Sequence, residues 1–446
     1  MRPNLVDIDP IQRIYVNRNL RLESIRAIGF DMDHTLATYK PVPFERLAFE
    51  KAKPKLVAVG YPQTLLRLKY QPDFVVRGLT VDKARGNILK MDRHRYVVQG
   101  YHGTRKLPPE QRKALYARHR IRLGGATYVP VDTLFSLPEI SLYAQMVDLM
   151  DAGSEPVNYR RLYDDVRGSM DEAHADGSIK RVIARHPMRF LELDSQLPEI
   201  LDRIISQGIK LFLLTNSEGP YTALIMAQLL DGRLEGRQHW TDFFDQIVVR
   251  AGKPAFFGRH DPLRPLSPRV LCRGGSRRPR FTYSGGSVHA LEKVLGVQGD
   301  KILFFGDHTY GDILKSKRIC GWRTAMIIRG LERELESLTE TRGQRLKLVV
   351  LERQIDRLVA WRDFLDRALE GQFPEGVVKR FLRDRDFGGG RRQIPAHKEA
   401  LRGQIRRLRS SLEKLTAEME ATFNPYWGPI FRAGPETSHF ANQVQE

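Results

Sequence analysis

The chain has 446 residues, of which 41% are hydrophobic and 28% are charged, and its formal net charge is +20. This length exceeds one compact core, so we expect a core domain with at least one further domain or large insertion, and the composition excludes collagen-like and disordered chains. No apolar run of about 18 residues occurs, and the N-terminus lacks the apolar segment of a signal peptide, so we expect neither membrane insertion nor secretion.

The two cysteines, Cys272 and Cys320, lie far apart and form neither a metal-binding spacing nor a disulfide framework. This cysteine usage predicts a cytoplasmic protein. The positive charge fits three interpretations: basic residues spread over solvated faces, attraction of a small phosphate-bearing ligand, or a nucleic-acid surface. No RRM, KH or zinc-finger pattern accompanies the charge. The first two interpretations are therefore favoured, and nucleic acid is not the expected partner.

Four apolar runs end in polar residues, at 24–35, 208–219, 244–254 and 301–312. Each is typical of a buried strand with polar side chains at its carboxyl end. Helix-like segments, such as 195–207, separate the runs. This alternation predicts an α/β fold with a doubly wound parallel sheet, in which ligands bind beyond the carboxyl ends of the strands.

The stretch 81–185 breaks this alternation. It begins with a hairpin-like segment and continues with helical patterns at 136–153 and 160–180. We therefore predict a catalytic core formed by residues 1–80 and 186–330. The insertion would be an α+β cap that lies over the edge where the core strands end.

Two further segments complete the predicted organisation. Residues 259–286, rich in Pro, Gly and Arg, indicate a long loop or irregular hairpin. Residues 331–446 predict a helical extension, because Leu and Ile recur at intervals of three and four in 397–423 and in an earlier partner segment. Two antiparallel helices joined by a Gly-rich turn at 387–390 would bury this seam. The seam fits packing within one subunit as well as a contact between subunits, and we expect a homo-oligomer.

Two acids, Asp31 and Asp33, follow the first apolar run. A turn or a helix N-cap accounts for one of them but not for the pair. Two carboxylates at a strand end repel each other unless a cation lies between them, and oxygen ligands select a hard divalent ion such as Mg²⁺. Asp307 and Asp312, after the last run, reach the same edge. We expect Mg²⁺ to bridge Asp31 and Asp307, with Asp312 holding the water shell of the metal, so that the four acids form one metal site.

Three further residues lie at the same predicted edge. Lys253 would offset the repulsion between a carboxylate nucleophile and a substrate phosphate. Thr215 and Asn216 offer hydroxyl, amide and backbone donors to phosphate oxygens. Each residue alone is a weak signal, but the order DxD, TN, K, GDxxxxD after four apolar runs is specific. The predicted catalytic residues are Asp31, Asp33, Thr215, Asn216 and Lys253.

In this order the motifs resemble those of the haloacid-dehalogenase-like phosphatase superfamily. DMDHT is similar to its first motif, LLTNS to its second, Lys253 to its third and GDHTYGD to its fourth. The resemblance implies a Rossmann-like core. It also implies that Asp31 attacks phosphorus to form an aspartyl-phosphate and that Asp33 protonates the leaving alcohol and then activates water. An acid at the position of Asp33 favours phosphatases, since transport ATPases carry Thr there and dehalogenases lack the metal arrangement.

Longer segments, among them GYPQTLLRLKYQPDFVVRGLTVDKARGNILKMD, TLFSLPE and FRAGPETSHFANQV, resemble the cytosolic purine 5′-nucleotidase family, the class preferring IMP and GMP. The similarity covers most of residues 20–330 and a short segment at 431–444. It implies Mg²⁺-dependent hydrolysis of purine nucleoside 5′-monophosphates. Phosphotransfer to nucleosides and regulation by nucleotide effectors also occur in that family.

The resemblance also assigns substrate contacts in the cap. Arg167 and Asp171, four residues apart on one helical face, would address the edge of a 6-oxopurine, and His174 would stack on it. The alternative for this pair is an ordinary intrahelical ion pair. At Tyr101 and His102 the chain departs from the Phe-Asn of vertebrate-type enzymes, which keeps stacking but changes the hydrogen bonding of the second position. The predicted substrate-binding residues are Tyr101, His102, Arg167, Asp171, His174, Lys180 and Ser217, with Lys180 near the phosphate.

Two alternative functions stay open. One is a phosphatase of the same superfamily that acts on another phosphorylated metabolite. The presence of Arg167, Asp171 and Lys180 in the cap makes this alternative less favoured. The other is a nucleic-acid-binding protein on a phosphatase fold, suggested by the +20 charge. The second alternative needs a degraded catalytic set, whereas here the set is complete.

Overall fold

The computed structural model describes residues 9, 13–16, 20–118, 120–123, 125–267, 282–388 and 390–445. Half of the loop predicted at 259–286, residues 268–281, therefore lies outside the described residues. The chain forms two compact units. An α/β unit contains Ile14–Arg329 and the C-terminal residues from Ile430, and a helical unit contains Gly330–Pro429.

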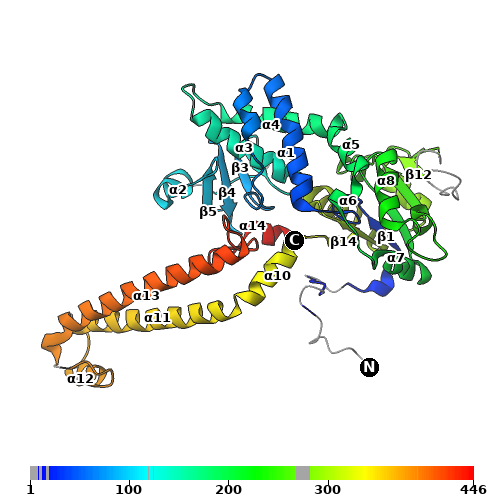
Figure 1. The fold of residues 1–446 in the computed structure, drawn as a ribbon. Coiled ribbons are helices and arrows are strands. Elements are labelled where there is room, and N and C mark those ends of the chain that lie inside the picture. The colour runs from blue at the N-terminus through cyan, green and yellow to red at the C-terminus, as the bar shows by residue number, and fades with distance from the viewer. Residues whose placement is uncertain are drawn as a thin grey trace. The chain divides into compact units, whose positions relative to one another are not determined.

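The α/β unit is built on a seven-stranded sheet, shown in Figure 1. Its strand order is β11 (Arg264–Pro265), β12 (Thr282–Ser284), β10 (Gln246–Val249), β9 (Lys210–Leu214), β1 (Ala27–Phe30), β13 (Ile302–Gly306) and β14 (Arg323–Met326). All neighbouring strands pair in parallel except β11, which pairs antiparallel with β12. The four central strands are almost entirely buried, which explains why they form continuous apolar runs. The predicted α/β fold with parallel strands is confirmed.

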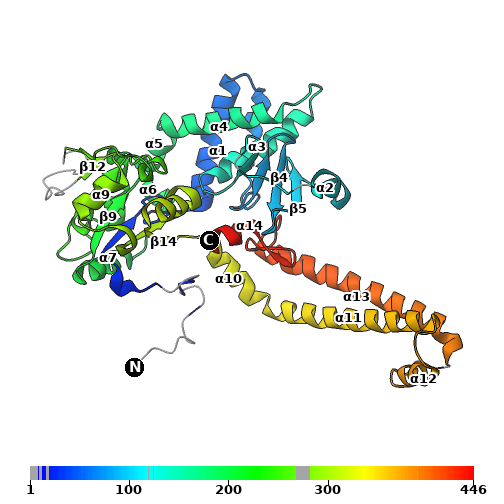
Figure 2. The ribbon, with the colours of Figure 1, turned by 180° about the vertical axis from the view of Figure 1, so that it is seen from behind.

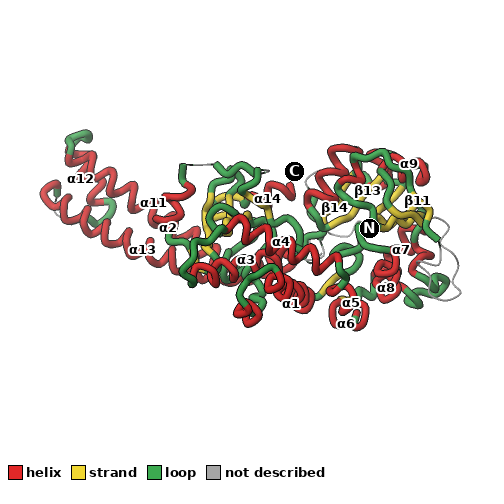
Figure 3. Tube along the Cα trace, turned by 90° about the horizontal axis from the view of Figure 1, so that it is seen from above, coloured by secondary structure: helices red, strands yellow, loops and turns green. Residues whose placement is uncertain are grey.

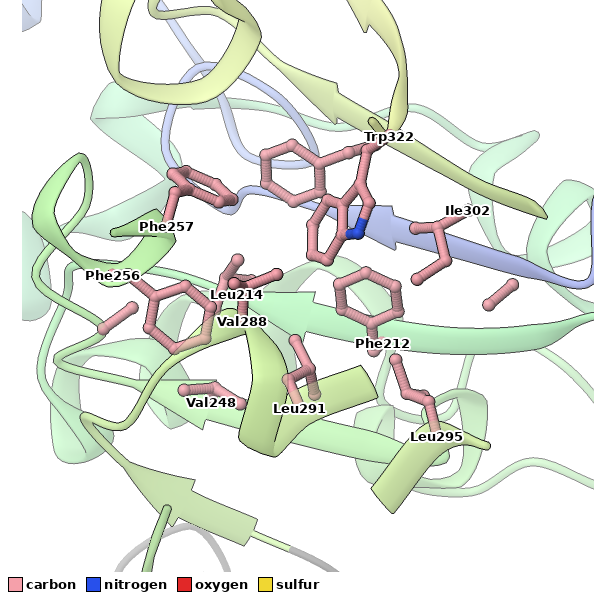
Figure 4. Packing of buried hydrophobic residues seen from close by; sticks show 13 residues of the cluster. Phe212, Leu214, Val248, Phe256, Phe257, Val288, Leu291, Leu295, Ile302 and Trp322 are labelled. Atoms are coloured by element: carbon pink, nitrogen blue, oxygen red, sulfur yellow. The ribbon is translucent and has the colours of Figure 1, made fainter. Parts of the chain in front are cut away.

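The core of this unit lies where the central strands meet α9 (Val288–Leu295) (Figure 4). Phe212 lies among other aromatic rings, with ring centroids 6.3 Å from Phe304 and 5.7 Å from Trp322. Gly29 on β1 is the register partner of Phe212 on β9. A Cβ atom at Gly29 would lie 2.1 Å from the Phe212 ring, so only glycine fits at this position. This close approach fixes how β1 and β9 pack, and therefore where both strands end.

A second sheet of five antiparallel strands belongs to the insertion. Its order is β6 (Arg105–Lys106), β5 (Val97–His102), β4 (Asn87–Met91), β3 (Thr80–Asp82) and β7 (Tyr128–Pro130). The expected hairpin in this region is formed by β4 and β5. Two short strands, β2 (Thr38–Tyr39) and β8 (Leu191–Glu192), pair antiparallel at the two ends of the insertion.

Helices surround both sheets of the α/β unit. They are α1 (Pro41–Ala58), α2 (Pro109–Tyr116), α3 (Ser136–Asp151), α4 (Tyr159–Ala175), α5 (Ser178–Arg185), α6 (Pro187–Phe190), α7 (Leu197–Ser206), α8 (Gly219–Leu230), α9 and α14 (His439–Gln445). The helix predicted at 160–180 is divided at Gly177, which has a φ of 74°. Helix α1 precedes residue 81 yet packs against α3 and α4, as both ribbon views show (Figures 1 and 2). The group of helices that packs with the second sheet thus begins with α1.

The helical unit consists of α10 (Gly330–Glu340), α11 (Arg342–Leu369), α12 (Glu375–Arg383) and α13 (Ile394–Phe423). Helices α11 and α13 pack side by side, which Figure 3 shows in a view from above. The predicted seam is present, with Ile355, Leu365, Leu401 and Ile405 buried in it. The connection differs from the predicted short Gly-rich turn, because α12 packs onto the end of the hairpin through Val378 and Leu382.

The C-terminal residues do not continue the helical unit, although the sequence groups them with it. They form a hairpin of β15 (Arg432–Ala433) and β16 (Glu436–Thr437) followed by α14. An antiparallel bridge joins Ser438 to Asp92, and the Arg93 N–H donates to the Thr437 carbonyl at 2.8 Å. These backbone contacts explain why the tail belongs to the α/β unit. Within the described part of the chain, no helix combines the length and apolar character needed to cross a bilayer.

The close contact at Gly29 yields a stability prediction. Gly29→Ala should lower the free energy of unfolding by about 1–3 kcal/mol, because the Phe212 ring is fully buried and cannot move aside. Gly168→Ala is the matched control, since a Cβ at this exposed position of α4 meets open space and Ala favours a helix by about 0.5–1 kcal/mol over Gly. Urea unfolding of both variants measures the difference. Equal stability of the two variants would contradict the packing argument.

Candidate functional site

The polar residues predicted at the sheet edge each follow a parallel strand. Asp31 comes directly after β1, Thr215 after β9 and Asp307 after β13, while Lys253 lies four residues beyond β10. Phe30 pairs with Leu213 on one side and with Phe305 on the other, so these strands end at nearly the same level. Parallel pairing in this register brings the polar ends together at one edge.

Three carboxylates form a compact cluster at this edge. Asp31, Asp307 and Asp312 each offer an oxygen, and these atoms lie within 4.8 Å of one another. The Lys253 ammonium joins two of them, with Nζ 2.9 Å from Asp31 Oδ1 and 2.7 Å from Asp312 Oδ1. All four side chains are buried. The structure thus brings together the lysine and three of the four acids predicted to hold a metal.

Burial and charge act on the protonation of this cluster. Burial, with the neighbouring Asp312, raises the pKa of Asp307 to about 7. Burial also raises the pKa of Asp31, and the Lys253 ammonium opposes this rise. For Lys253 itself, burial alone would lower the pKa, but Asp31 and Asp312 outweigh it and raise that pKa above its usual value. Lys253 therefore remains a cation beside the acids.

The cluster has the properties of a divalent-cation site. Asp307 Oδ2 is buried and finds no hydrogen-bond partner among the described residues, as expected for an atom that serves as a metal ligand. If Asp31, Asp33 and the two acids of the last motif are all ionised, Lys253 and the buried Arg77 offset two of the four negative charges. A divalent ion neutralises the remaining two, and hard oxygen donors suit such an ion.

Asp33 lies outside the three-carboxylate cluster. Its Oδ1 accepts a hydrogen bond from the Tyr39 hydroxyl at 2.7 Å, and its Oδ2 accepts one from the Ser217 hydroxyl at 2.6 Å. The Tyr39 hydroxyl lies 3.0 Å from that of Tyr221. Both carboxylate oxygens of Asp33 are thus held by hydroxyl groups. Ser217, predicted to bind substrate, orients Asp33 in this structure.

Thr215 and Asn216 connect the ends of β9 and β10. Asn216 Oδ1 accepts from the Lys253 N–H at 2.7 Å, and Asn216 Nδ2 donates to the Lys253 carbonyl at 3.0 Å. The buried Thr215 Oγ1 accepts from the Ser217 N–H at 3.0 Å. The second motif therefore fixes the backbone of the residue that carries the ammonium group.

The last motif depends on a glycine for a close approach. A Cβ at Gly306 would lie 2.5 Å from the Asp312 Cβ, so a larger residue would displace that acid. The His308 N–H donates to Asp312 Oδ2 at 3.2 Å, and residues Thr309–Leu314 form a short π-helix. Close packing on Gly306 at the end of β13 and a hydrogen bond from its own loop therefore fix the position of Asp312.

Two of the cap residues are linked to Asp33 through intermediate groups or through charge. The Lys180 ammonium on α5 lies 5.3 Å from the ring centre of Tyr221 on α8, whose hydroxyl is part of the chain that reaches Asp33. Burial, followed by the charge of Lys180, lowers the pKa of His174, whereas Asp171 and Asp33 oppose this effect. Lys180 and His174 therefore lie within electrostatic reach of each other, and His174 within reach of Asp33.

Phe135, an aromatic residue outside the predicted set of substrate-binding residues, lies beside His174. The ring of Phe135 is 5.7 Å from the His174 ring, edge to face, and 4.7 Å from the buried ring of His34. Phe135 belongs to the segment TLFSLPE, which carries part of the family resemblance but no periodic signal for an aromatic contact. The structure thus adds Phe135 to the candidate site.

Arg167 has one partner that was predicted and one that was not. Its Nε lies 3.2 Å from Asp171 Oδ2, which is the intrahelical ion pair of the alternative interpretation. Its Nη1 lies 3.3 Å from Glu139 Oε2, a buried carboxylate that also accepts from the Tyr163 hydroxyl at 3.0 Å. The partner on α3 holds the guanidinium in one position, which an isolated surface pair would not do.

Tyr101 and His102 have other surroundings. The buried ring of Tyr101 packs edge to face on Phe74, with centroids 5.5 Å apart. His102 lies between Asn87 Oδ1 at 2.8 Å and Asp151 Oδ2 at 2.7 Å. These contacts belong to the antiparallel sheet and its surroundings. None of these contacts connects Tyr101 or His102 to the acidic cluster.

Comparisons with known proteins identify the family of this chain. The profile of the 5′ nucleotidase family matches residues 14–446. A 5′-nucleotidase domain-containing protein of Dictyostelium discoideum is 30% identical over 451 residues, which cover 98% of this chain and 70% of that protein. The human 5′-nucleotidase domain-containing protein 2 is 26% identical over 458 residues, which cover 97% of this chain and 78% of that protein. The chain belongs to the 5′-nucleotidase family.

Proposed function

We propose that this protein is a Mg²⁺-dependent 5′-nucleotidase that hydrolyses purine nucleoside 5′-monophosphates, IMP and GMP above others, to a nucleoside and phosphate. Family membership supports hydrolysis of phosphoric monoesters. The observation that carries the proposal is the buried Lys253 ammonium between Asp31 and Asp312. A cation in this place permits an ionised carboxylate to face a phosphate dianion, which repulsion would otherwise prevent.

The first chemical step in this proposal belongs to Asp31. Its carboxylate is oriented by the Met32 N–H, which donates to Oδ1 at 2.7 Å, and by Lys253. It attacks phosphorus, a P–O bond to Asp31 forms, and the bond to the 5′ oxygen of the nucleoside breaks. Asp31, Asp307 and Asp312 would hold a Mg²⁺ ion, which neutralises charge on the phosphate oxygens when bound.

Asp33 serves as the acid and base of the proposed cycle. In its protonated form it gives a proton to the departing 5′ oxygen, and as a carboxylate it then takes one from the water that hydrolyses the aspartyl-phosphate. The hydroxyls of Tyr39 and Ser217 hold both of its oxygens in place. A nucleoside hydroxyl in place of water would give phosphotransfer by the same chemistry.

The cap would select the base and hold the phosphate. Phe135 and His174 present aromatic rings for a purine, and Arg167, fixed by Glu139, presents donors for a carbonyl oxygen on it. Lys180 adds a positive charge near the phosphate side. This set supports a purine nucleotide as substrate in preference to another phosphorylated metabolite.

We also propose that the protein works as a homo-oligomer in the cytoplasm. Helix α11 exposes Leu346, Val349 and Val350, and the seam residues Leu412 and Leu415 are half-buried. Apolar side chains left exposed beside a seam support a contact with a second copy.

Loss of the nucleophile is the first prediction from this mechanism. Asp31→Asn should lower kcat for IMP at least about 10³-fold, because an amide cannot form the aspartyl-phosphate. Asp194→Asn, which changes an exposed acid, is the matched control and should keep wild-type activity. Phosphate release from IMP with Mg²⁺ measures both variants. Hydrolysis by Asp31→Asn at the wild-type rate would exclude covalent catalysis by this residue.

The pKa of Asp307 yields a pH prediction for the metal. This pKa is raised from about 4 to about 7 in the folded protein, so between these pH values the folded state without metal retains a proton that the unfolded chain has lost. The stability of the metal-free protein therefore falls as pH rises from about 4 to about 7. A metal ion must displace the same proton, so Mg²⁺ should raise the melting temperature more at about pH 8 than at about pH 6. Melting curves with MgCl₂ and with EDTA at both pH values test this. Asp307→Asn should abolish the Mg²⁺ effect at both, and an effect independent of pH would contradict the assignment.

Two substitutions on α4 test whether Arg167 selects the base of the substrate. Arg167→Gln should raise the KM for IMP about 10-fold, with a smaller effect on UMP, because a charge-assisted hydrogen bond to the purine is lost. Arg161→Gln removes the exposed ion pair with Asp165 on the same helix and should leave both KM values unchanged. An equal rise for IMP and UMP would place Arg167 outside base recognition.

A further inference from the structure

Arg77 is a buried arginine that reaches the metal-binding loop from the segment before β3. It is 5% exposed. Its Nη1 donates to the carbonyl oxygen of Asp307 at 2.9 Å, and its Nη2 donates to that of Ile327 at 3.3 Å. These two carbonyls lie directly after β13 and β14. One guanidinium therefore joins the ends of two adjacent strands at the residue that carries a metal-binding carboxylate.

The contact requires the shape of arginine as well as its charge. The two strand ends are already linked by the Ile327 N–H, which donates to the Gly306 carbonyl at 2.9 Å. Arg77 adds a second link across the same pair. A planar guanidinium can donate to two acceptors in fixed directions, whereas the ammonium group of lysine is a compact point charge.

The surroundings hold this guanidinium in place. It lies over the ring of Phe440 on α14, 5.7 Å from the ring centre. The next residue, Gly78, has a φ of 90°, and a Cβ there would lie 2.3 Å from the Phe440 Cβ, so the chain passes directly against this ring. Burial tends to lower the pKa of Arg77, while Asp307 and Asp132 raise it. Two carbonyl acceptors, an aromatic ring and nearby carboxylates therefore compensate the burial of this charge.

We propose that Arg77 is a positioning residue that fixes the backbone of Asp307 so that its carboxylate faces Asp31 and Asp312. The inference rests on the metal site of the proposed function and adds a residue that supports it. Arg77 acts through the Asp307 backbone and needs no contact with the substrate. Partners of metal ligands typically contribute 10–100-fold to metal affinity.

The charge of Arg77 and its hydrogen bonds have opposite expected effects on the affinity of the site for a metal ion. Removal of a positive charge beside the site would by itself strengthen the binding of a cation. Loss of the two carbonyl contacts would weaken it, because Asp307 would no longer be held. Arg77→Lys separates the two effects, because it keeps the positive charge but loses the planar guanidinium that donates to both carbonyls.

The experiment measures binding of Mn²⁺, as a probe for Mg²⁺, by electron paramagnetic resonance on the full chain without substrate. Arg77→Lys should weaken Mn²⁺ binding about 10-fold relative to wild type. Arg67→Lys, at an exposed position in the same part of the chain, is the matched control and should bind as wild type. Phe440→Leu, which removes the ring beneath the guanidinium, should weaken binding by about 2–5-fold. Melting curves without metal establish that each variant is folded.

The outcomes distinguish the two proposals. Wild-type protein that binds no Mn²⁺ would refute the metal site of the proposed function. Wild-type protein that binds Mn²⁺, together with a folded Arg77→Lys variant of equal affinity, would overturn the role of Arg77 alone. If Arg77→Lys does not fold, Phe440→Leu decides, and unchanged Mn²⁺ affinity in that variant overturns the inference.

Discussion

The repulsion between acids at the end of a parallel sheet is the constraint on which the site depends. Asp31, Asp307 and Asp312 are buried with their oxygens within 4.8 Å of one another. In a medium of low polarity such a group is stable only if protons or cations compensate its charge. Lys253 provides one cation inside the cluster, and the remaining negative charge could be compensated by a bound metal ion.

The structure meets this constraint by fixing backbones as well as side chains. Asn216, which follows β9, holds both the N–H and the carbonyl of Lys253, which follows β10. A residue at the end of one strand therefore positions the ammonium group that follows the neighbouring strand. Arg77, in the segment before β3, holds the carbonyl of Asp307 and is itself packed on the C-terminal helix. The charged groups therefore depend on segments far apart in the chain, and the segment before β3 and the C-terminal tail both support the site.

The sequence predicts the core of this arrangement because parallel strands buried on both faces appear as continuous apolar runs. The polar residue after each run then follows from strand order alone, as for Asp31 and Asp307. The contacts within the cap are harder to predict from the sequence. Glu139 and Phe135 act through partners on other elements, and no local pattern indicates such pairs. The return of the tail to the α/β unit depends on a backbone bridge between Asp92 and Ser438, which no periodicity reveals.

The surroundings of the two acids of the first motif explain how neighbours could take different parts in one reaction. Asp31 faces the Lys253 ammonium, which stabilises its ionised form and suits a nucleophile. Asp33 faces the hydroxyls of Tyr39 and Ser217, which can hold its carboxyl group in either protonation state, because a hydroxyl both donates and accepts. Two carboxyl groups in contrasting surroundings are what a cycle of attack and proton transfer requires. The side chains of β2 and of the second motif, which supply these hydroxyls, are therefore as much a condition of the proposed chemistry as the acids themselves.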